Sequence, residues 1–448
     1  MATDELADAT ASELARLVNE REASPVEIVE ALLARIEAMD SKVHAWETLD
    51  REGALRAARA LAGTTGELPL KGVPVGIKDI YLTGGLRTTA SFPPFANFVP
   101  EHEAEAVSRL RRAGAIVLGK TVTTQFALAD PPPTRNPWNL DRTPGGSSSG
   151  SAAAVGGRMV PLGMGTQTKG SVLRPAAYCG AVGFKPTFGR ISRRNVFPLA
   201  WSFDTVGFIC RSVEDVVLTL GVLAGRDPDD PSSARQPVDD YVEAYDAPRP
   251  AAPRLGLVLD YFDRAHPEVR HQVRQTVRKL EQAGATLVEL RLPLDFEVVS
   301  AVHDLILHVE AAAAHTQLIE REPAGYGPLL RETIQTGQLI PASSYVQAQR
   351  LRLRFRNKMD DLLSPVDALL TPTASNVAPG PETTGDASFQ APWTQVGLPA
   401  ISLPAGVSQD GLPLAVQLAG RRFEEGALLS VARWAEAVIG PLPRPPAP

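Results

Sequence analysis

The sequence predicts an α/β fold, in which helices cover a β-sheet. Apolar strand-like runs alternate with segments of helical periodicity, first between 72 and 118 and again between 254 and 290. The chain has 448 residues, of which 44% are hydrophobic and 21% are charged, a composition that can fill a sizeable interior. Length alone allows roughly two or three domains.

The first clear helix is expected to start at Ser24. Ser24 can accept hydrogen bonds from the first free N–H groups, Pro25 suits the first helical position, and Glu27 completes a capping box. Further helices are expected at 51–62, 105–113, 268–283 and 427–438, with a long helical stretch at 296–363. Strands are expected at 72–81, 115–118, 254–259, 284–290, 368–371 and 400–404.

Charge and composition argue against several classes of function. The net charge of −6 indicates no basic face for nucleic acid, and no run approaches the ~18 apolar residues of a membrane span. Segment 1–11 has three acidic residues and no apolar core, which argues against a signal peptide. Cys179 and Cys210 form no disulfide framework, so a reducing cytoplasm is expected. The proline-rich segment 441–448 is expected to be a disordered tail.

Three familiar signals fail when their context is considered. Segment 114–121 has the spacing of a Walker A loop, but the residues between its glycines are themselves strand-like. Gly146-Ser-Ser-Ser-Gly150 has the spacing of the α/β-hydrolase nucleophile elbow, but no hydrophobic strand precedes it. The seven histidines suggest no metal cluster, and solvated or helix-surface positions are expected for them.

The remaining polar signals are a serine-rich glycine loop, a second Gly-Ser turn and a lysine inside an apolar run. Cleavage of an amide needs a nucleophile, a base, an acid for the leaving amine and donors for the oxyanion. Lys78 lies between Ile77 and Ile80, where loss of solvent lowers a lysine pKa, sometimes by about 3–5 units. Taken alone, Lys78 is better explained by an ion pair with Asp79 or by extension to solvent.

Three neighbouring segments together resemble the amidase signature. They are Gly145-Gly-Ser-Ser-Ser-Gly-Ser151, Gly165-Thr-Gln-Thr-Lys-Gly-Ser171 and Arg174-Pro-Ala-Ala-Tyr-Cys-Gly-Ala-Val-Gly-Phe-Lys-Pro-Thr187. Segments 72–79 and 113–121 upstream, and 204–207 and 397–417 downstream, resemble further parts of the same family in the same order. The resemblance therefore covers nearly the whole chain.

The resemblance implies a catalytic triad. Ser171 would be the nucleophile, Ser147 a bridging serine that follows a cis peptide, and Lys78 the base. The loop before Ser171 can direct successive N–H groups at an oxyanion. The implied donors are the backbone N–H groups of Thr168, Lys169 and Gly170.

The same resemblance implies the fold and its organisation. One α/β/α domain over residues 1–440 is expected around a large mixed sheet. The core signature would span about 72–210, and a variable helical region at about 296–363 would lie on the substrate side. No metal or cofactor is expected.

The sequence departs from the family pattern at three positions. Gln167 stands where an aspartate is common, Lys169 where a glycine is common, and Leu173 where an arginine is common, with Arg174 one place later. Arg174 is equally expected to hold a substrate carboxylate or to be structural. Lys169 would be strained if its φ were positive, or would help keep Lys78 neutral if it pointed inward. The expected substrate-binding residues are Arg174, Gln167, Gly146, Phe126 and Ala127.

Local hydrogen bonds and core packing are the expected roles of several other side chains. Ser148, Ser149 and Ser151 are expected to bond the backbone around the loop rather than react. Aromatic residues that could line an apolar pocket are more often part of the core. They are Trp201, Phe203, Phe208 and Phe126.

The favoured function is hydrolysis of aryl or small amides, with carbamates (a urethanase activity) as a further possibility. The alternative is a glutaminase-type subunit of a tRNA-dependent amidotransferase complex. A non-catalytic scaffold is disfavoured because all three triad positions are intact. The expected partner is a small amide or carbamate, without nucleic acid or membrane, and the expected state is a monomer or homodimer in the cytoplasm.

Overall fold

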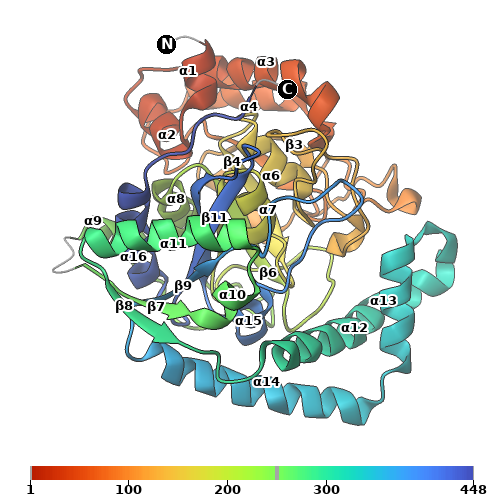
Figure 1. Cartoon of the computed structure of the whole chain (residues 1–448). Helices are drawn as coiled ribbons and strands as arrows, with labels where there is room; N and C mark the ends of the chain where they lie inside the picture. Colours follow the sequence, from red (N-terminus) through yellow and green to blue (C-terminus); the bar gives the residue numbers. More distant parts are fainter. Residues whose placement is uncertain (1–2, 248–251, 447–448) are drawn as a thin grey trace.

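The computed structural model describes residues 3–247 and 252–446. The strands of this part of the chain are β1 (Trp46–Leu49), β2 (Pro74–Lys78), β3 (Ile116–Thr121), β4 (Leu162–Gln167), β5 (Val182–Lys185), β6 (Thr205–Cys210), β7 (Arg254–Val258), β8 (Thr286–Leu290), β9 (Ala368–Pro372), β10 (Ala400–Val407) and β11 (Pro413–Ala419). They form one sheet in the order β1-β3-β2-β4-β6-β5-β10-β11-β9-β7-β8 (Figure 1).

The sheet mixes parallel and antiparallel pairs. β2 pairs in parallel with β3 and β4, and β7 pairs in parallel with β8 and β9. The other neighbouring pairs are antiparallel. The expected α/β fold with a large mixed sheet is therefore confirmed.

Helices connect the strands and cover the sheet. They are α1 (Thr3–Asp8), α2 (Ala11–Asn19), α3 (Pro25–Val43), α4 (Arg51–Ala62), α5 (Glu105–Arg112), α6 (Ser149–Gly156), α7 (Leu173–Tyr178), α8 (Val213–Leu223), α9 (Tyr241–Asp246), α10 (Leu259–Arg264), α11 (Pro267–Gln282), α12 (Phe296–Arg321), α13 (Pro328–Leu339), α14 (Ala342–Leu363), α15 (Ala391–Val396) and α16 (Glu425–Ile439). Helix α3 has the predicted capping box, in which Ser24 and Glu27 each accept a backbone N–H.

Two groups of helices pack on the central strands. α6 and α7 contact each other, α6 against β2, β3 and β4, and α7 against β5, β10 and β11. α16 contacts α8, α11, β10 and β11. The predicted helical stretch consists mainly of α12, α13 and α14, which form an arm in the lower right of Figure 1. Within the described residues, no helix is both long and apolar enough to cross a membrane.

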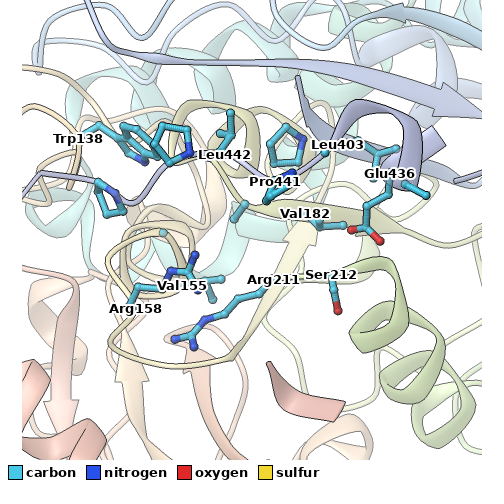
Figure 2. A pocket seen from close by; sticks show the side chains of 18 residues that line it. Trp138, Val155, Arg158, Val182, Arg211, Ser212, Leu403, Glu436, Pro441 and Leu442 are labelled. Atoms are coloured by element: carbon cyan, nitrogen blue, oxygen red, sulfur yellow. The ribbon is translucent and has the colours of Figure 1, made fainter. Parts of the chain in front are cut away.

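The proline-rich tail lies across a cavity of about 350 Å³ (Figure 2). Pro441 and Leu442 line this cavity together with Trp138 and Arg211. Nearby, Arg444 Nη1 lies 2.8 Å from Asp8 Oδ2, which joins the tail to α1. The described part of the tail has no helix or strand, and residues 447–448 lie outside the described residues. None of the predicted triad residues lines this cavity.

We expect Gly150→Ala to destabilise the fold. A Cβ at Gly150 would lie 2.2 Å from the carbonyl oxygen of Ala45 and 2.4 Å from the Val122 nitrogen, so backbone must move. Overpacking of this kind costs about 1–3 kcal/mol or more. The matched control is Gly221→Ala on α8, where a Cβ meets nothing within 4 Å and helix propensity gains about 1 kcal/mol. Thermal unfolding should show a lower Tm for the first and an equal or higher Tm for the second; equal Tm values would contradict this packing.

Candidate active site

The predicted site forms where β2 and β4 end. The two strands are parallel neighbours, with Ile77 opposite Met164, so their carboxyl ends meet at one edge of the sheet. Lys78 is the last residue of β2, and Thr166 is next to the end of β4. Parallel strands commonly place functional groups at this edge. The strand register therefore brings the predicted base beside the loop that carries Ser171.

Lys78 is fully buried and hydrogen-bonded to two hydroxyl groups. Its Nζ lies 2.7 Å from Ser147 Oγ and 2.9 Å from Thr166 Oγ1. Burial lowers the pKa of Lys78 well below its ordinary value, and the negative charge of Asp204 partly opposes this shift. A fully buried ammonium without an adjacent carboxylate is costly, so the neutral amine is favoured.

The ion pair of Lys78 with Asp79 does not form. Asp79 Oδ1 instead lies 3.2 Å from Lys120 Nζ, and its Oδ2 accepts from the Thr89 N–H at 2.9 Å and the Thr89 hydroxyl at 2.5 Å. Lys120 also donates to the Tyr81 carbonyl at 2.7 Å. The two structural explanations considered for Lys78, solvent exposure and pairing with Asp79, are therefore wrong.

Ser147 precedes α6 and lies behind a cis peptide bond from Gly146, as the resemblance implied. The serines that follow it are engaged elsewhere. Ser149 Oγ donates to the Gly145 carbonyl at 2.7 Å, and Ser151 Oγ donates to the Met164 carbonyl at 2.7 Å. Ser148 Oγ lies 3.4 Å from the Thr166 carbonyl oxygen, consistent with a weak bond. Their predicted local hydrogen bonding is confirmed.

Gln167 fixes the turn that carries Ser171. Its side-chain oxygen accepts from the N–H groups of Val172 at 2.9 Å and Leu173 at 3.0 Å, which caps α7. Its side-chain nitrogen donates to Thr394 Oγ1 at 3.0 Å. Both ends of the amide are thus occupied by protein groups, and the geometry gives Gln167 a structural task rather than the expected contact with substrate.

The predicted nucleophile and oxyanion donors remain free. Ser171 is 7% exposed, and in the described part of the chain its hydroxyl makes no hydrogen bond. The backbone N–H groups of the predicted donors Thr168, Lys169 and Gly170, and that of Ser171, which was not predicted, likewise donate to no acceptor among the described residues. The Ser148 N–H donates to the Ser171 carbonyl at 3.3 Å, which holds the two loops together. Free donors beside a free hydroxyl are what an incoming amide carbonyl requires.

Arg174 is buried and bonds the backbone of two loops. Its Nη2 donates to the Gly146 carbonyl at 2.6 Å, and its Nη1 donates to the Gly385 carbonyl at 2.6 Å. The buried Nε makes no hydrogen bond among the described residues. Of the two roles considered equally for Arg174, this geometry supports the structural one, because the guanidinium positions the peptide before Ser147.

Lys169 points away from Lys78. Its Nζ lies 2.5 Å from Asp304 Oδ1 on α12, and its carbonyl accepts from Thr394 Oγ1 at 2.9 Å. Its φ is not positive, so the strain considered for this residue is absent. Burial lowers the Lys78 pKa and Asp204 partly opposes that shift, without a contribution from Lys169. The idea that Lys169 keeps Lys78 neutral is therefore not supported.

A cavity of about 210 Å³ reaches Thr166, a hydrogen-bond partner of Lys78, although Lys78, Ser147 and Ser171 do not line it. Its wall is largely apolar, and its polar groups include Thr166, Thr168, Asp204 and Arg193. Ala127 lines it as expected, whereas Phe126 is buried in a cluster with Phe92 and Phe95. Trp201, Leu199 and Phe197 also line the cavity.

Asp204 and Arg193 were not predicted as site residues. Asp204 Oδ1 accepts from Thr168 Oγ1 at 2.6 Å, and its Oδ2 accepts from the N–H groups of Leu199 and Ala200. Arg193 Nη1 donates to the Asp204 carbonyl at 3.1 Å. The available sequence signal was the position of Asp204 in a family segment, but only the fold places it near Lys78.

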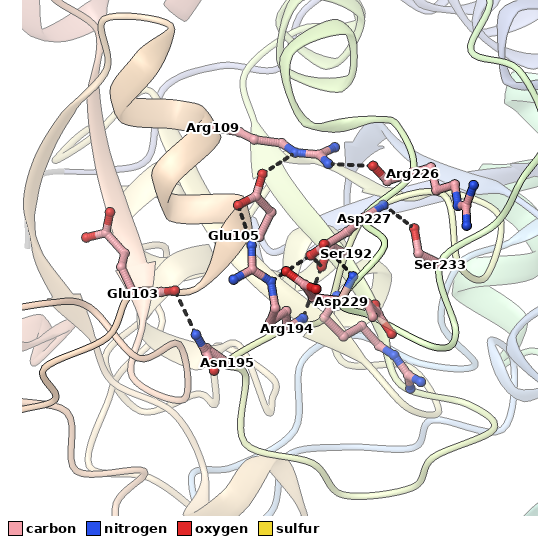
Figure 3. Close-up of polar contacts among 12 residues, drawn as sticks. Glu103, Glu105, Arg109, Ser192, Arg194, Asn195, Arg226, Asp227, Asp229 and Ser233 are labelled. Atoms are coloured by element: carbon pink, nitrogen blue, oxygen red, sulfur yellow. Dashed lines mark hydrogen bonds and ion pairs between the residues drawn. The ribbon is translucent and has the colours of Figure 1, made fainter.

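A polar network holds one wall of this cavity in place (Figure 3). Arg194, which lines the cavity, lies 2.8 Å from both Glu105 of α5 and Asp227. Asp227 also accepts from the Ser192 hydroxyl at 2.7 Å, and Glu105 pairs with Arg109 at 3.0 Å. The segment before Val196 is thereby fixed to α5.

Two histidines on α12 are buried, so the expected solvated or surface positions were wrong for them. His303 stacks on Phe203 with ring centroids 4.2 Å apart, and His315 packs against Phe126 at 4.8 Å. Burial lowers the pKa of His303 well below its ordinary value and that of His315 to about 4. Within the described residues, no group of three or more His, Cys, Asp or Glu side chains could hold a metal ion.

Comparison with known proteins places this geometry in a family. The amidase family model matches residues 27–429. The chain belongs to the amidase family. A glutamyl-tRNA(Gln) amidotransferase subunit of Moorella thermoacetica is 38% identical, over 94% of this chain and 95% of that protein.

Solved structures agree with this placement. 6-Aminohexanoate cyclic dimer hydrolase has a TM-score of 0.87 and 27% identity, over 98% of this chain and 99% of its own. An s-triazine catabolic enzyme, described with a vestigial protein complex, has a TM-score of 0.89 and 28% identity, over 97% and 99%.

Membership fixes the coarse activity of this protein, which is hydrolysis of a C–N bond. The names of the relatives bear on its partners. Several relatives of similar length are named as subunits of an amidotransferase whose name includes a tRNA. These names conflict with the expectation of a small-molecule partner without nucleic acid. The expected specificity for carbamates has no support among these relatives and stays a prediction.

We expect Asp204→Asn to move the activity of this amidase to lower pH. Only neutral Lys78 can accept a proton, and the Asp204 carboxylate raises the Lys78 pKa. Removal of that charge must lower this pKa, so the limb of kcat/KM that reports Lys78 deprotonation should shift to lower pH. Thr168→Val is the control, because it removes a hydrogen bond to Asp204 and keeps the charge. A limb that stays or moves upward in Asp204→Asn would refute this coupling.

We expect Arg174→Ala to weaken stability and to reduce activity on all amides alike. The substitution leaves the buried Gly146 carbonyl without its donor, at about 1–3 kcal/mol, and also frees the partly buried Gly385 carbonyl. Thermal unfolding and kcat/KM on a carboxylate-bearing amide and a neutral anilide measure both effects. A loss confined to the carboxylate-bearing amide, with an unchanged Tm, would instead assign Arg174 to the substrate.

Proposed function

We propose that this amidase cleaves its substrate through an acyl-enzyme on Ser171, with Ser147 as proton relay and Lys78 as base. The observation that carries the proposal is the 2.7 Å hydrogen bond between the buried Lys78 amine and Ser147 Oγ. Burial supplies the neutral amine that this role requires. The free hydroxyl of Ser171 and the free N–H groups of its loop supply the nucleophile and the oxyanion donors.

In the proposed steps, each proton that leaves one group is accepted by another. Ser171 Oγ bonds to the amide carbon while its proton passes to Ser147, whose own proton passes to Lys78 Nζ. When the C–N bond breaks, the proton returns through Ser147 to the leaving nitrogen. Water then attacks the ester, its proton takes the same route to Lys78, and the Ser171 oxygen leaves and regains a proton. Arg174 holds the Gly146 peptide, and Gln167 holds the Ser171 turn.

Glutamine is the first candidate substrate. The proteins 33–38% identical to this chain over nearly its whole length are named as subunits of glutamyl-tRNA(Gln) amidotransferase. In that role the released ammonia would pass to a transfer reaction on partner chains, and this chain would be one component of a complex.

An apolar amide, such as an anilide, is the second candidate. Leu199, Phe197 and Trp201 line the cavity beside Thr168. Aromatic and aliphatic walls favour an apolar group over the charged α-amino and α-carboxylate groups of glutamine. A neighbour in fold, 6-aminohexanoate cyclic dimer hydrolase, is named for an amide of aliphatic character.

We expect Ser171→Ala to abolish turnover of either substrate class while the Tm changes little, because one small hydroxyl without a hydrogen bond contributes little to stability. Wild-type enzyme with a nitroanilide should release a burst of amine, and mass spectrometry should find the acyl group on Ser171. Ser148→Ala is the matched control and should keep most activity. Loss of activity in Ser148→Ala together with retained activity in Ser171→Ala would overturn the assignment.

The two substrate candidates are separated with the isolated chain. Ammonia release from glutamine and amine release from an anilide are measured side by side, with molecular mass from gel filtration and light scattering. Efficient anilide cleavage without glutaminase activity would support a standalone amidase. Glutaminase activity alone would support the amidotransferase role.

A further inference from the structure

A side chain of the loop that carries Ser171 forms an ion pair with the helical arm. Lys169, two residues before Ser171, extends its ammonium 2.5 Å from Asp304 Oδ1 on α12. The side chains are 23% and 42% exposed, so the pair is accessible to solvent and salt. The backbone of Lys169 is meanwhile held by α15, through the Thr394 hydroxyl at 2.9 Å.

The residue beside Asp304 touches the same loop. His303 is fully buried, and the backbone of Thr168 is near enough to raise its pKa, although burial and the charge of Lys169 lower it more. Two consecutive residues of α12 therefore meet two consecutive residues of the loop.

The arm also holds the opposite wall of the cavity. Glu310 of α12 accepts from the Ser202 N–H at 2.8 Å and the Ser202 hydroxyl at 2.6 Å. Arg352 of α14 donates to the Ser202 carbonyl at 2.7 Å and to the Gln395 carbonyl at 2.6 Å. Ser202 lies between Trp201 and Asp204, which both line the cavity. A displacement of α12 would therefore displace the cavity wall relative to Ser171.

We propose that the Lys169–Asp304 ion pair is a tether that sets the position of the helical arm against the Ser171 loop and so determines which acyl groups this amidase accepts. The side chain of Lys169 then determines specificity through α12, separately from the backbone N–H of the same residue, which is among the proposed oxyanion donors. The consequence for substrate selection rests on the proposed acyl-enzyme function, but the tether itself does not.

The test compares Lys169→Met, Asp304→Asn and the double variant. Each should lower the ratio of kcat/KM for a nitroanilide with a bulky acyl group to that for acetyl nitroanilide, which has the same leaving amine, by about two- to fivefold, the range for a partly exposed pair. The double variant should lose no more than either single variant, because all three break one contact. Lys169→Arg should restore the ratio. The pH limb that reports Lys78 should stay in place, because Lys169 does not act on that group.

A matched control removes a different ion pair from the same helix. Glu297 of α12 pairs with Arg264, away from the Ser171 loop, so Glu297→Gln should leave the ratio unchanged. In 1 M NaCl, charges are screened over about 3 Å. The ratio of kcat/KM values for the wild type should then approach the ratio for Lys169→Met, and the ratio for Lys169→Met should change little. The proposed tether would be refuted if the losses in this ratio were additive in the double variant. It would also be refuted if Lys169→Met changed the ratio and Asp304→Asn did not.

A second readout does not depend on turnover. Amide hydrogen exchange of the free enzyme should quicken in the turn of α12 around Asp304 in Lys169→Met and Asp304→Asn, whereas any change in Glu297→Gln should stay within the first turn of the helix. Unchanged exchange in both tether variants would refute the tether even if the enzyme is active. If the wild type cleaves neither amide but hydrogen exchange quickens in both tether variants, the tether is supported and the proposed function is refuted.

Discussion

Removal of one lysine amine from water is the constraint on which the rest of this site depends. Lys78 can act as a base only while it is neutral, and its burial at the end of β2 is what keeps it so. The surrounding groups satisfy the amine without charging it, because Ser147 and Thr166 offer hydroxyl groups. The carboxylate next to Lys78 in the sequence, Asp79, pairs with Lys120 instead. A direct carboxylate partner for Lys78 would restore the ammonium and end its function.

Three residues that depart from the expected family pattern are engaged by other protein groups. Gln167 caps α7, and Arg174 joins the Gly146 and Gly385 carbonyl groups. Lys169 reaches α12. These contacts keep three loops in register around a small cavity, whose far wall is fixed by Arg194 and Glu105. These contacts join elements that are distant in sequence.

Local signals in the sequence predicted much of the fold. They could not predict contacts between residues that are far apart in the sequence. The capping box at Ser24 and the apolar runs at 254–259 and 284–290 depend on neighbours in sequence, and those elements formed. β4, β5 and β6 were missed as strands because their small residues lack the alternation of a half-buried strand. The triad came from the family resemblance. The burial of His303 depends on Phe203, a hundred residues earlier, and no periodicity reports such a contact.

The order of strands has a consequence for synthesis of the chain on the ribosome. β5 is completed at Lys185, but its neighbour β10 pairs Ala400 with that residue, and Thr394 closes on the Ser171 loop from the same late region. Roughly two hundred residues must be translated in between, at about 5–20 residues per second, while the edge of β5 stays unpaired. A nascent chain therefore carries all three triad residues long before it can fix them, and we infer that hydrolytic competence arises only after the C-terminal strands have emerged.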